Sequence, residues 1–458
     1  MGEDAPAGTS GMEQPSEDPN VSSASPTTQD TLPRHLDDVE VSRLRADFPI
    51  LGRSVNGVPL TYLDSGATSQ KPSCVYEAEQ HFYENFNAAV HRGAHSLAVE
   101  ATDIFEQART DVAGFIGAKD NEVIWTSNAT EALNLITYSF GNASAGLGGE
   151  AARAFALEAG DEIVVTELEH HANLIPWQEL ALRTGATLKY IPVDDSGALR
   201  MDLAGSIVTP ATKVLAFTHV SNVLGTVTDV PALVALARNV GALTVLDGCQ
   251  SVPHLPVDVK QLDVDFMAFS GHKMLGPTGI GGLYGRAELL NAMPPFLTGG
   301  SMITSVTMEK AEYLPAPMRF EAGTQRISQA HALATAVSYL QEVGMDRIAA
   351  WEELLGERML TGLGTIPGVR VLGPAPGAAR IGTAPFVVEG VHPHDVGQFL
   401  DSRGVAVRVG HHCAQPLHRA LGVVSSTRAS TYLYNTTSDI DRLLNAVSDV
   451  RGYFGVGK

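Results

Sequence analysis

Short apolar runs that alternate with helical patterns, from about residue 60 to residue 285, constrain the fold of this chain most strongly. A helical stretch between two of the runs, at 231–241, begins with Pro and ends with Gly, as helices often do. Strands that are apolar along their whole length are buried on both faces, which is typical of a mainly parallel sheet covered by helices. The runs lie at 162–166, 214–218, 243–246, 266–269 and 282–284.

The pattern changes near residue 326, and a chain of 458 residues is long enough for two domains. Two long helices at 329–343 and 347–361 are followed by strands at 369–372 and 384–388. We therefore expect a large α/β domain over 61–325 and a smaller α+β domain over 326–458. A segment at 37–60, starting with a helix at 36–48, should pack on the smaller domain. The Ala/Gly-rich stretch at 141–160 is interpreted as a surface insertion.

The composition limits which partners and which cellular compartment we expect for this protein. Lys and Arg total 31 against 51 Asp and Glu, and this net charge of −20 argues against nucleic acid or an anionic membrane as a partner. Residues 1–36 are polar and acidic and should form a disordered tail. The sequence has no apolar run long enough to span a membrane, and no secretory signal is expected. Three widely spaced cysteines suggest reduced thiols in the cytoplasm and no metal site; Cys74 and Cys249 are interpreted as core residues.

Two residues at predicted strand ends suggest a cofactor. Ligands of such sheets bind at the carboxyl ends of the strands. Lys273 follows the run at 266–269, and Asp247 directly follows the run at 243–246. Alone, they would be a solvated loop lysine and an acid that caps a turn. Together they fit pyridoxal 5′-phosphate (PLP), which needs a lysine for its Schiff base and a carboxylate near its pyridine nitrogen.

Further residues near these strand ends complete a PLP site. Residues 127–135 open a helix whose free N–H groups could hold a phosphate, although alone they are only a capped helix. Ser270 and His272 would be further phosphate donors, and Gln250 could donate to the ring oxygen. His170 is either a loop residue or a group that stacks on the ring and moves protons.

The segment around Cys413 indicates the reaction. Two histidines precede this thiol and Arg408 lies close in sequence, so the thiol is poised to be a nucleophilic thiolate. Arg428 offers a bidentate partner for an amino-acid carboxylate, although an arginine near a strand is more often part of a surface ion pair.

Six motifs, taken in order, resemble those of the SufS-type cysteine desulfurases, in the class V aminotransferase group of fold type I PLP enzymes. The resemblance extends from about residue 41 to residue 453. Departures are few, with Ser65-Gly66 and Gln325-Arg326 standing where other residues are commoner. The matching motifs lie at 63–72, 91–95, 169–173, 270–273, 319–324 and 408–413.

The resemblance implies a role for each matched residue. Cys413 would take the sulfur of L-cysteine as a persulfide, leaving alanine. Asn222 and Arg428, with Arg408 beside them, would bind the substrate carboxylate. Lys273 would form the Schiff base, Asp247 would pair with the pyridine nitrogen, and His170 would stack on the ring. The phosphate would be held by Thr130, Ser270, His272 and, across a homodimer, Thr324 of the partner subunit.

The resemblance also implies a partner protein, and it leaves alternative functions open. The short loop after Cys413 is similar to that of the branch with a dedicated sulfur-acceptor protein, SufU-like or SufE-like, for iron–sulfur cluster assembly. His394 resembles the histidine that binds such an acceptor's zinc, whereas composition alone favours the simpler interpretation of a helix N-terminus. The rivals are a selenocysteine lyase, a β-lyase without a thiol nucleophile, and an inactive sulfur-transfer scaffold.

Overall fold

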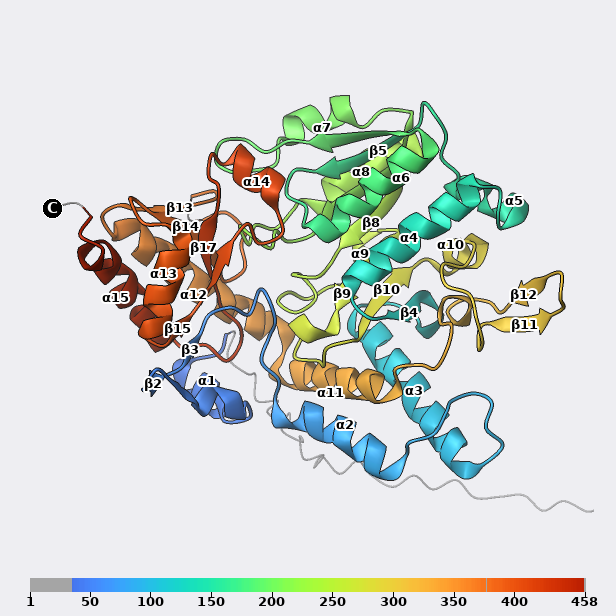
Figure 1. The fold of residues 1–458 in the computed structure, drawn as a ribbon, viewed down its shortest axis with the longest axis horizontal. Helices are drawn as coiled ribbons and strands as arrows, with labels where there is room; N and C mark the ends of the chain where they lie inside the picture. Colours follow the sequence, from blue (N-terminus) through green and yellow to red (C-terminus); the bar gives the residue numbers. More distant parts are fainter. Residues whose placement is uncertain (1–34, 376, 457–458) are drawn as a thin grey trace, which may run out of the picture. The chain divides into compact units, whose positions relative to one another are not determined.

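A computed structural model describes residues 35–375 and 377–456. The predicted disordered tail, except for its last two residues, lies outside the described residues. No helix in this part of the chain is long and apolar enough to cross a membrane. The described chain forms one compact unit with a large sheet and a small sheet, as Figure 1 shows.

The large sheet confirms the predicted α/β class. Within the described residues it has seven strands in the order β4-β10-β9-β8-β7-β5-β6. All neighbours pair in parallel except β10, which runs antiparallel to both β4 and β9, so the sheet is mixed but mainly parallel. The strands are β4 (Val123–Thr126), β5 (Glu162–Thr166), β6 (Thr187–Ile191), β7 (Thr212–Thr218), β8 (Leu243–Asp247), β9 (Phe266–Ser270) and β10 (Gly281–Gly285).

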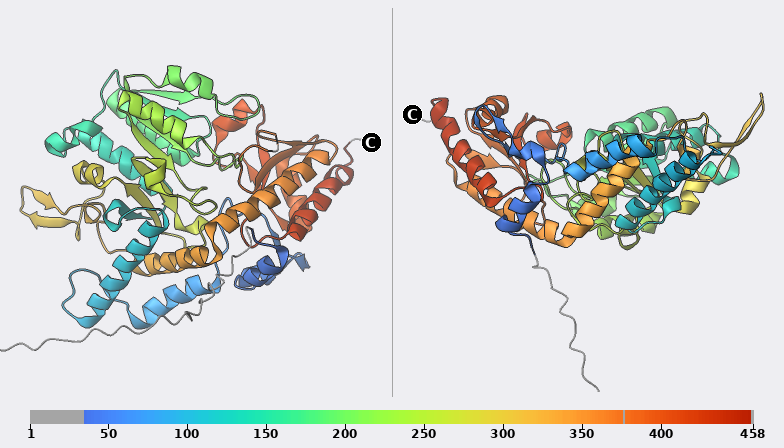
Figure 2. Two further views of the ribbon diagram at one scale, coloured as in Figure 1. Left: turned by 180° about the vertical axis from the view of Figure 1, so that it is seen from behind. Right: turned by 90° about the horizontal axis from the view of Figure 1, so that it is seen from below.

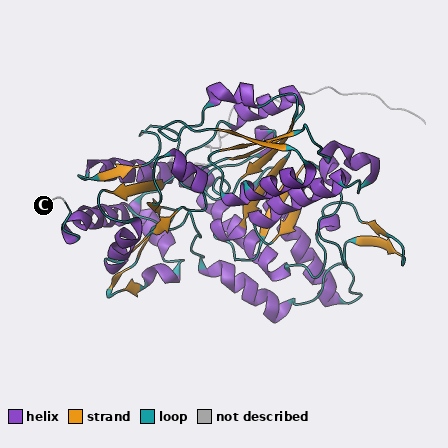
Figure 3. Ribbon diagram, turned by 45° about the horizontal axis from the view of Figure 1, so that its top comes forward, coloured by secondary structure: helices purple, strands orange, loops and turns teal. Residues whose placement is uncertain are grey.

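Successive residues of a strand pack against helices on opposite faces of this sheet. In β5, Ile163 and Val165 belong to one buried apolar cluster and Val164 to another. The first cluster contains α4 (Ala129–Ser144) and α6 (Ile175–Thr184); the second contains α3 (Ser96–Phe115), α8 (Val230–Val240) and α11 (Ile327–Val343). Figure 3 shows the strands between these helices. This double burial explains why the strands are apolar throughout.

The small sheet is antiparallel, with the order β13-β14-β17-β16. Its strands are β13 (Val369–Val371), β14 (Thr383–Val388), β16 (Arg408–Gly410) and β17 (Ser426–Ser430). The helices around it are α12 (Met345–Thr365), α13 (Pro393–Ser402) and α15 (Thr437–Tyr453). This sheet agrees with the predicted α+β region at the C-terminal end of the chain.

Residues near the N-terminal end of the described chain join this C-terminal region. Strand β3 (Thr61–Tyr62) pairs in parallel with β15 (Val405–Ala406). Helix α1 (Asp38–Arg45) contacts the start of α15, where Arg45 Nη1 lies 3.1 Å from Asp439 Oδ2. Pro49 follows α1 as expected, and a short turn leads to the hairpin β1 (Ser54–Val55) and β2 (Val58–Pro59).

Helix α11 packs on α2 (Ser73–Asn85) and α3, as both views in Figure 2 show, and it therefore contacts the large-sheet region. We propose that α11 connects the two predicted domains, whose limits at 325 and 326 stay a prediction. The remaining elements are α5 (Gly149–Ala152), α7 (Met201–Ile207), α9 (Val259–Leu262), α10 (Ala287–Ala292), α14 (Gln415–Ala420) and the hairpin β11 (Ile303–Val306) with β12 (Ala311–Tyr313).

Most of residues 141–160 are exposed, as expected of a surface segment, but part of the segment belongs to the core, which its interpretation as a surface insertion did not predict. Helix α4 continues through the first of them to Ser144, and α5 follows. Phe155 and Leu157 are buried in the same apolar cluster as α4, where the Phe155 ring packs 5.1 Å from that of Phe140. The many Ala and Gly residues hid these two core side chains.

Candidate functional site

One cavity of about 240 Å³ lies where the ends of the large-sheet strands meet loops of the small-sheet region. Strands β5, β7, β8 and β9 are parallel, so their carboxyl ends share one edge of the sheet. The structure brings together eleven of the residues predicted for the site. They are Thr130, His170, Asn222, Asp247, Gln250, Ser270, His272, Lys273, Arg408, Cys413 and Arg428.

Lys273 stands in a short 3-10 turn directly after β9, and the backbone before it is tightly held. The His272 carbonyl oxygen accepts from Ser69 N (3.1 Å), Ser69 Oγ (3.1 Å), Thr68 Oγ1 (3.0 Å) and Lys71 Nζ (2.8 Å). Ser69 Oγ also accepts from Leu275 N at 2.9 Å, on the other side of Lys273. The peptide carrying Lys273 is thus fixed by the segment at 68–71.

Asp247 ends β8 inside the cavity wall and is only 5% exposed. Its Oδ1 accepts from Cys249 N at 2.9 Å. Burial raises the pKa of Asp247, because the charged carboxylate loses its hydration. A cationic ring N–H placed against it would favour the ionised form.

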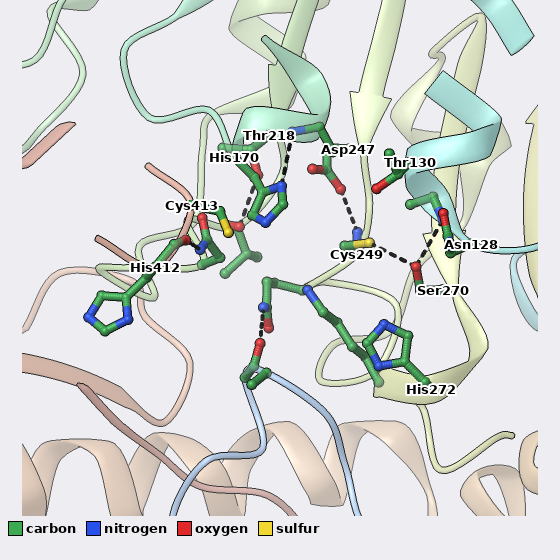
Figure 4. A pocket seen from close by; sticks show the side chains of 18 of the residues that line it. Asn128, Thr130, His170, Thr218, Asp247, Cys249, Ser270, His272, His412 and Cys413 are labelled. Atoms are coloured by element: carbon green, nitrogen blue, oxygen red, sulfur yellow. Dashed lines mark hydrogen bonds between the residues drawn. The ribbon is translucent and has the colours of Figure 1, made fainter. Parts of the chain in front are cut away.

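The N-terminus of α4 opens on the same cavity. Asn128 caps the helix by accepting from Glu131 N at 3.0 Å, and Ser270 Oγ accepts from Ala129 N at 2.9 Å. His272 Nδ1 lies 3.2 Å from Thr68 Oγ1, and burial lowers the pKa of His272 to about 4, so the ring is neutral at pH 7. Figure 4 shows Asn128, Thr130, Ser270 and His272 together on one side of the cavity, an arrangement suited to an anion at a helix N-terminus.

His170 follows β5 and lines the cavity with its ring neutral. Its Nδ1 accepts from Ala172 N at 3.0 Å, which places the ring hydrogen on Nε2. Burial, together with nearby Lys273, lowers the pKa of His170 to about 3. The neighbouring Glu169 anchors the turn by accepting from Asn173 Nδ2 at 2.6 Å and from Thr218 N at 2.9 Å.

Cys413 lies on an exposed loop between β16 and α14, across the cavity from Ser270 (Figure 4). Both His412 (φ 50°) and Cys413 (φ 56°) adopt the left-handed region, which is costly for non-glycine residues. Two hydrogen bonds hold the loop against the large-sheet region: Asn222 Nδ2 donates to the His412 carbonyl at 2.6 Å, and His171 N donates to the Cys413 carbonyl at 2.7 Å.

Arg428 is buried in β17, with only 2% of its side chain exposed. Its Nη1 donates to the Asn222 carbonyl at 2.6 Å, and its Nη2 lies 3.3 Å from Asp64 Oδ1. Gly66 leaves room for this guanidinium, since a Cβ at that position would lie 3.2 Å from Arg428 Nη2. The unusual Ser65-Gly66 pair therefore has a packing reason at its second position.

The residues present fit PLP. Besides the amine of Lys273 and the buried carboxylate of Asp247, four buried polar atoms of cavity residues have no hydrogen-bond partner in the described structure: Gln250 Oε1, Asn222 Oδ1, Arg428 Nε and His412 Nδ1. Unpaired buried polar groups are costly, so their presence indicates a site built for a polar ligand. Gln250 Nε2 donates to the Gly66 carbonyl at 2.8 Å, so one of its two amide hydrogens is already used.

Thr324 is the predicted site residue that the structure does not bring into this cavity. It lines a separate pocket together with Glu131 of α4 and Arg326. The sequence analysis also missed contributors to the main cavity. Cys249 packs against the apolar cluster of α4, as expected of a core residue, but it also lines the cavity, with Sγ 3.5 Å from Ser270 Oγ. Its position two residues after Asp247 was the available signal.

Comparison with known proteins agrees with this geometry. The aminotransferase class-V family matches residues 61–443. A probable cysteine desulfurase of Mycobacterium leprae is 55% identical, over 92% of this chain and 99% of its own. One from Streptomyces coelicolor is 48% identical, over 91% of this chain and 98% of its own. The solved apo structure of a cysteine desulfurase from Thermococcus onnurineus superposes with a TM-score of 0.83 at 38% identity, covering 90% and 98% of the two chains.

The chain therefore belongs to the aminotransferase class-V family, and it is a PLP-dependent enzyme of the fold type I group. The relatives that share 45–55% identity with it over most of its length carry the name cysteine desulfurase. The class V group and the relationship to cysteine desulfurases that the six motifs predicted are confirmed, whereas the SufS type stays a prediction.

Proposed function

We propose that this enzyme removes the sulfur atom of L-cysteine, releases L-alanine and keeps the sulfur as a persulfide on Cys413. It is a cysteine desulfurase, as are the relatives that match nearly its whole length. The observation that carries the residue assignment is that the exposed Cys413 lines the same cavity as Lys273, Asp247 and Arg428. Nucleophile, cofactor groups and carboxylate partner thus surround one substrate-sized space.

The chain's own residues would hold the cofactor from three sides. Lys273 would bond to it, Asp247 would pair with its ring nitrogen, and the α4 N-terminus with Thr130, Ser270 and His272 would take its phosphate. Bound PLP withdraws electrons from the substrate carbons and so makes the carbon–sulfur bond breakable. His170, with its hydrogen on Nε2, would stack on the ring and exchange protons with the substrate.

The sulfur transfer would be carried by Cys413. Its thiolate attacks the substrate sulfur, and a sulfur–sulfur bond forms as the substrate's Cβ–S bond breaks. The electron pair of the broken bond goes to the carbon side, which takes up a proton and leaves as alanine. Arg428, fixed by Asn222 and Asp64, would hold the substrate carboxylate so that the sulfur faces Cys413.

The test is incubation of the PLP-loaded protein with L-cysteine, with and without a thiol reductant. With reductant, alanine and sulfide should form in equal amounts over many turnovers. Without it, one alanine per chain should form and the protein should gain one sulfur atom in mass at Cys413. Pyruvate, ammonia and sulfide in place of alanine, with no protein-bound sulfur, would contradict the assignment and favour a β-lyase.

Selenocysteine lyase activity is the second candidate, because the same carboxylate and ring contacts accept either amino acid. A direct competition between L-cysteine and L-selenocysteine, scored by kcat/KM, decides between the two substrates. An inactive scaffold would show neither product nor a PLP absorption band.

We also propose how the subunits assemble and which protein receives the sulfur. We infer a cytoplasmic homodimer of the SufS type in which Thr324 of each subunit contributes to the partner's phosphate site, since Thr324 lies away from its own cavity. Thr324→Val should then weaken PLP binding, and a mixture with Lys273→Ala subunits should restore a share of it in hybrid dimers. Unchanged PLP affinity in the variant would remove Thr324 from the site.

The persulfide would pass to a SufU-like or SufE-like acceptor for iron–sulfur cluster assembly. His394 is exposed in the first turn of α13, and its N–H donates to His392 Nδ1 at 3.2 Å. The helix N-terminus expected from the sequence is thus present, and the imidazole stays free to bind an acceptor's zinc. His394→Ala should lose only the acceptor-stimulated rate, with His81→Ala, on the exposed surface of α2, as the control; an equal loss of the basal rate would contradict this role.

A further inference from the structure

Two arginines of the cavity stand in an unfavourable arrangement. Arg408 of β16 lies directly opposite Arg428 of β17 in an antiparallel pair. Like charges at directly opposite positions destabilise a sheet. Arg428 is almost fully buried, whereas 50% of the Arg408 side chain is exposed. Water can therefore screen the repulsion between the two charges only at Arg408.

Asp64 offsets the repulsion between Arg408 and Arg428 from outside the cavity lining. Its Oδ1 lies 3.3 Å from Arg428 Nη2 and its Oδ2 lies 3.7 Å from Arg408 Nη1, so one carboxylate contacts both guanidinium groups. Both arginines line the cavity, whereas Asp64 is not one of the lining residues in the described chain. Asp64 lies two residues after the end of β3, and a β-bridge to Ser430 sets its position.

The three side chains together set the net charge at this end of the cavity. Two arginines contribute +2 and Asp64 contributes −1, which leaves one positive charge facing the substrate. A single substrate carboxylate neutralises it. A second acidic group on the substrate would find no unpaired cation at this end of the cavity and would meet the field of Asp64.

We propose that Asp64 is a specificity-determining residue that makes this end of the cavity accept amino acids with one carboxylate and reject those with a second acidic group. The inference rests on the proposed function, because it takes Arg408 and Arg428 as the substrate's carboxylate partners. Asp64 acts through the arginines and does not touch the substrate, so it is a positioning residue.

The experiment measures binding and not turnover. The PLP-loaded protein is titrated with L-alanine and with L-aspartate, and the absorption change gives a Kd for each. The wild-type protein should favour L-alanine. Asp64→Asn leaves two positive charges, so the ratio of the L-aspartate Kd to the L-alanine Kd should fall about tenfold, equal to about 1.4 kcal/mol of discrimination. Added salt should reduce this gain.

A charge rescue distinguishes this role from simple support of the fold. The double variant Asp64→Asn with Arg408→Gln again carries one positive charge, and its ratio should return toward the wild-type value. Arg408→Gln alone, at a half-exposed position, leaves no net charge, so the L-alanine Kd should rise about tenfold.

The outcomes separate the two hypotheses. An unchanged ratio in Asp64→Asn, or a double variant that does not recover, overturns the charge-selection role. If Asp64→Asn does not fold, Arg408→Gln alone decides, and an unchanged L-alanine Kd overturns the proposal. A wild-type protein that shows no absorption change with L-alanine and forms no sulfide from L-cysteine fails the proposed function itself.

Discussion

The two walls of the cavity differ in how they are built. The large-sheet wall places its groups directly at strand ends, with Asp247 the last residue of β8 and Ser270 the last of β9. The opposite wall carries the proposed nucleophile, Cys413, on a loop, where Cys413 is exposed and two successive residues adopt left-handed conformations. Strand ends suit a cofactor that has to be held in one position, and in the proposed function an exposed loop would let Cys413 pass its sulfur to another protein.

From this difference we predict that substitutions in the two walls impair two different functions. Changes in the large-sheet wall should affect the cofactor, and changes in the loop wall should affect sulfur transfer while the cofactor stays bound.

Lys273→Ala should have the largest effect. It removes the amine that bonds to PLP, so the visible absorption of lysine-bound PLP and all measurable turnover should be lost. Lys213→Ala, at an exposed lysine of β7, is the matched control and should behave as wild type. Retention of the visible band in Lys273→Ala would disprove the assignment of the cofactor lysine.

Cys413→Ala should abolish turnover as well, but with the cofactor unaffected. The PLP band and the absorption change on adding L-cysteine should remain, while neither protein-bound sulfur nor alanine accumulates. Cys74→Ala, which removes a partly buried thiol of α2 away from the cavity, should keep the activity. Equal alanine production by Cys413→Ala and the wild-type protein would show that the loop wall is not needed for sulfur transfer.

His170 sharpens the comparison, because it can act by stacking or by proton transfer. His170→Phe keeps a flat ring but loses the nitrogen, so PLP should stay bound while turnover falls about 10²- to 10⁴-fold. His170→Ala should in addition weaken PLP binding. If the Phe variant keeps full turnover, the role of His170 is stacking alone.

The smallest effect concerns acid stability of the cofactor-free protein. Burial lowers the pKa of His170 to about 3, of His219 to about 4 and of His412 to about 2. Between these values and about 6.5 the unfolded chain binds protons at these three sites that the folded chain does not, so their contribution to the free energy of unfolding should fall as pH decreases from 6.5 to 4. Glu169, whose pKa burial raises to about 8, contributes with the opposite sign. Urea unfolding across this range tests it, and His219→Phe should flatten the dependence; a slope that does not change would exclude His219 as a contributor.

The sequence predicted the large-sheet wall better than the loop wall, for a physical reason. Asp247 and Lys273 directly follow apolar strands of a parallel sheet, so sequence order alone places them at one edge. Asp64 could not be assigned in this way, because its contact with Arg428 spans 364 residues and depends on how the small-sheet region folds back. The core role of Phe155 was missed, since no periodic pattern surrounds it.

The pairing of β3 with β15 has a consequence for how the protein is made. Thr61 reaches its partner Val405 only after 344 further residues have been synthesised. On the ribosome, the strands at 123–285 can assemble early, whereas β3 must wait until the last part of the chain has emerged. Asp64 meets Arg428 at the same late moment. A nascent chain can therefore form the wall that carries Asp247 and Lys273 before Asp64 reaches Arg428.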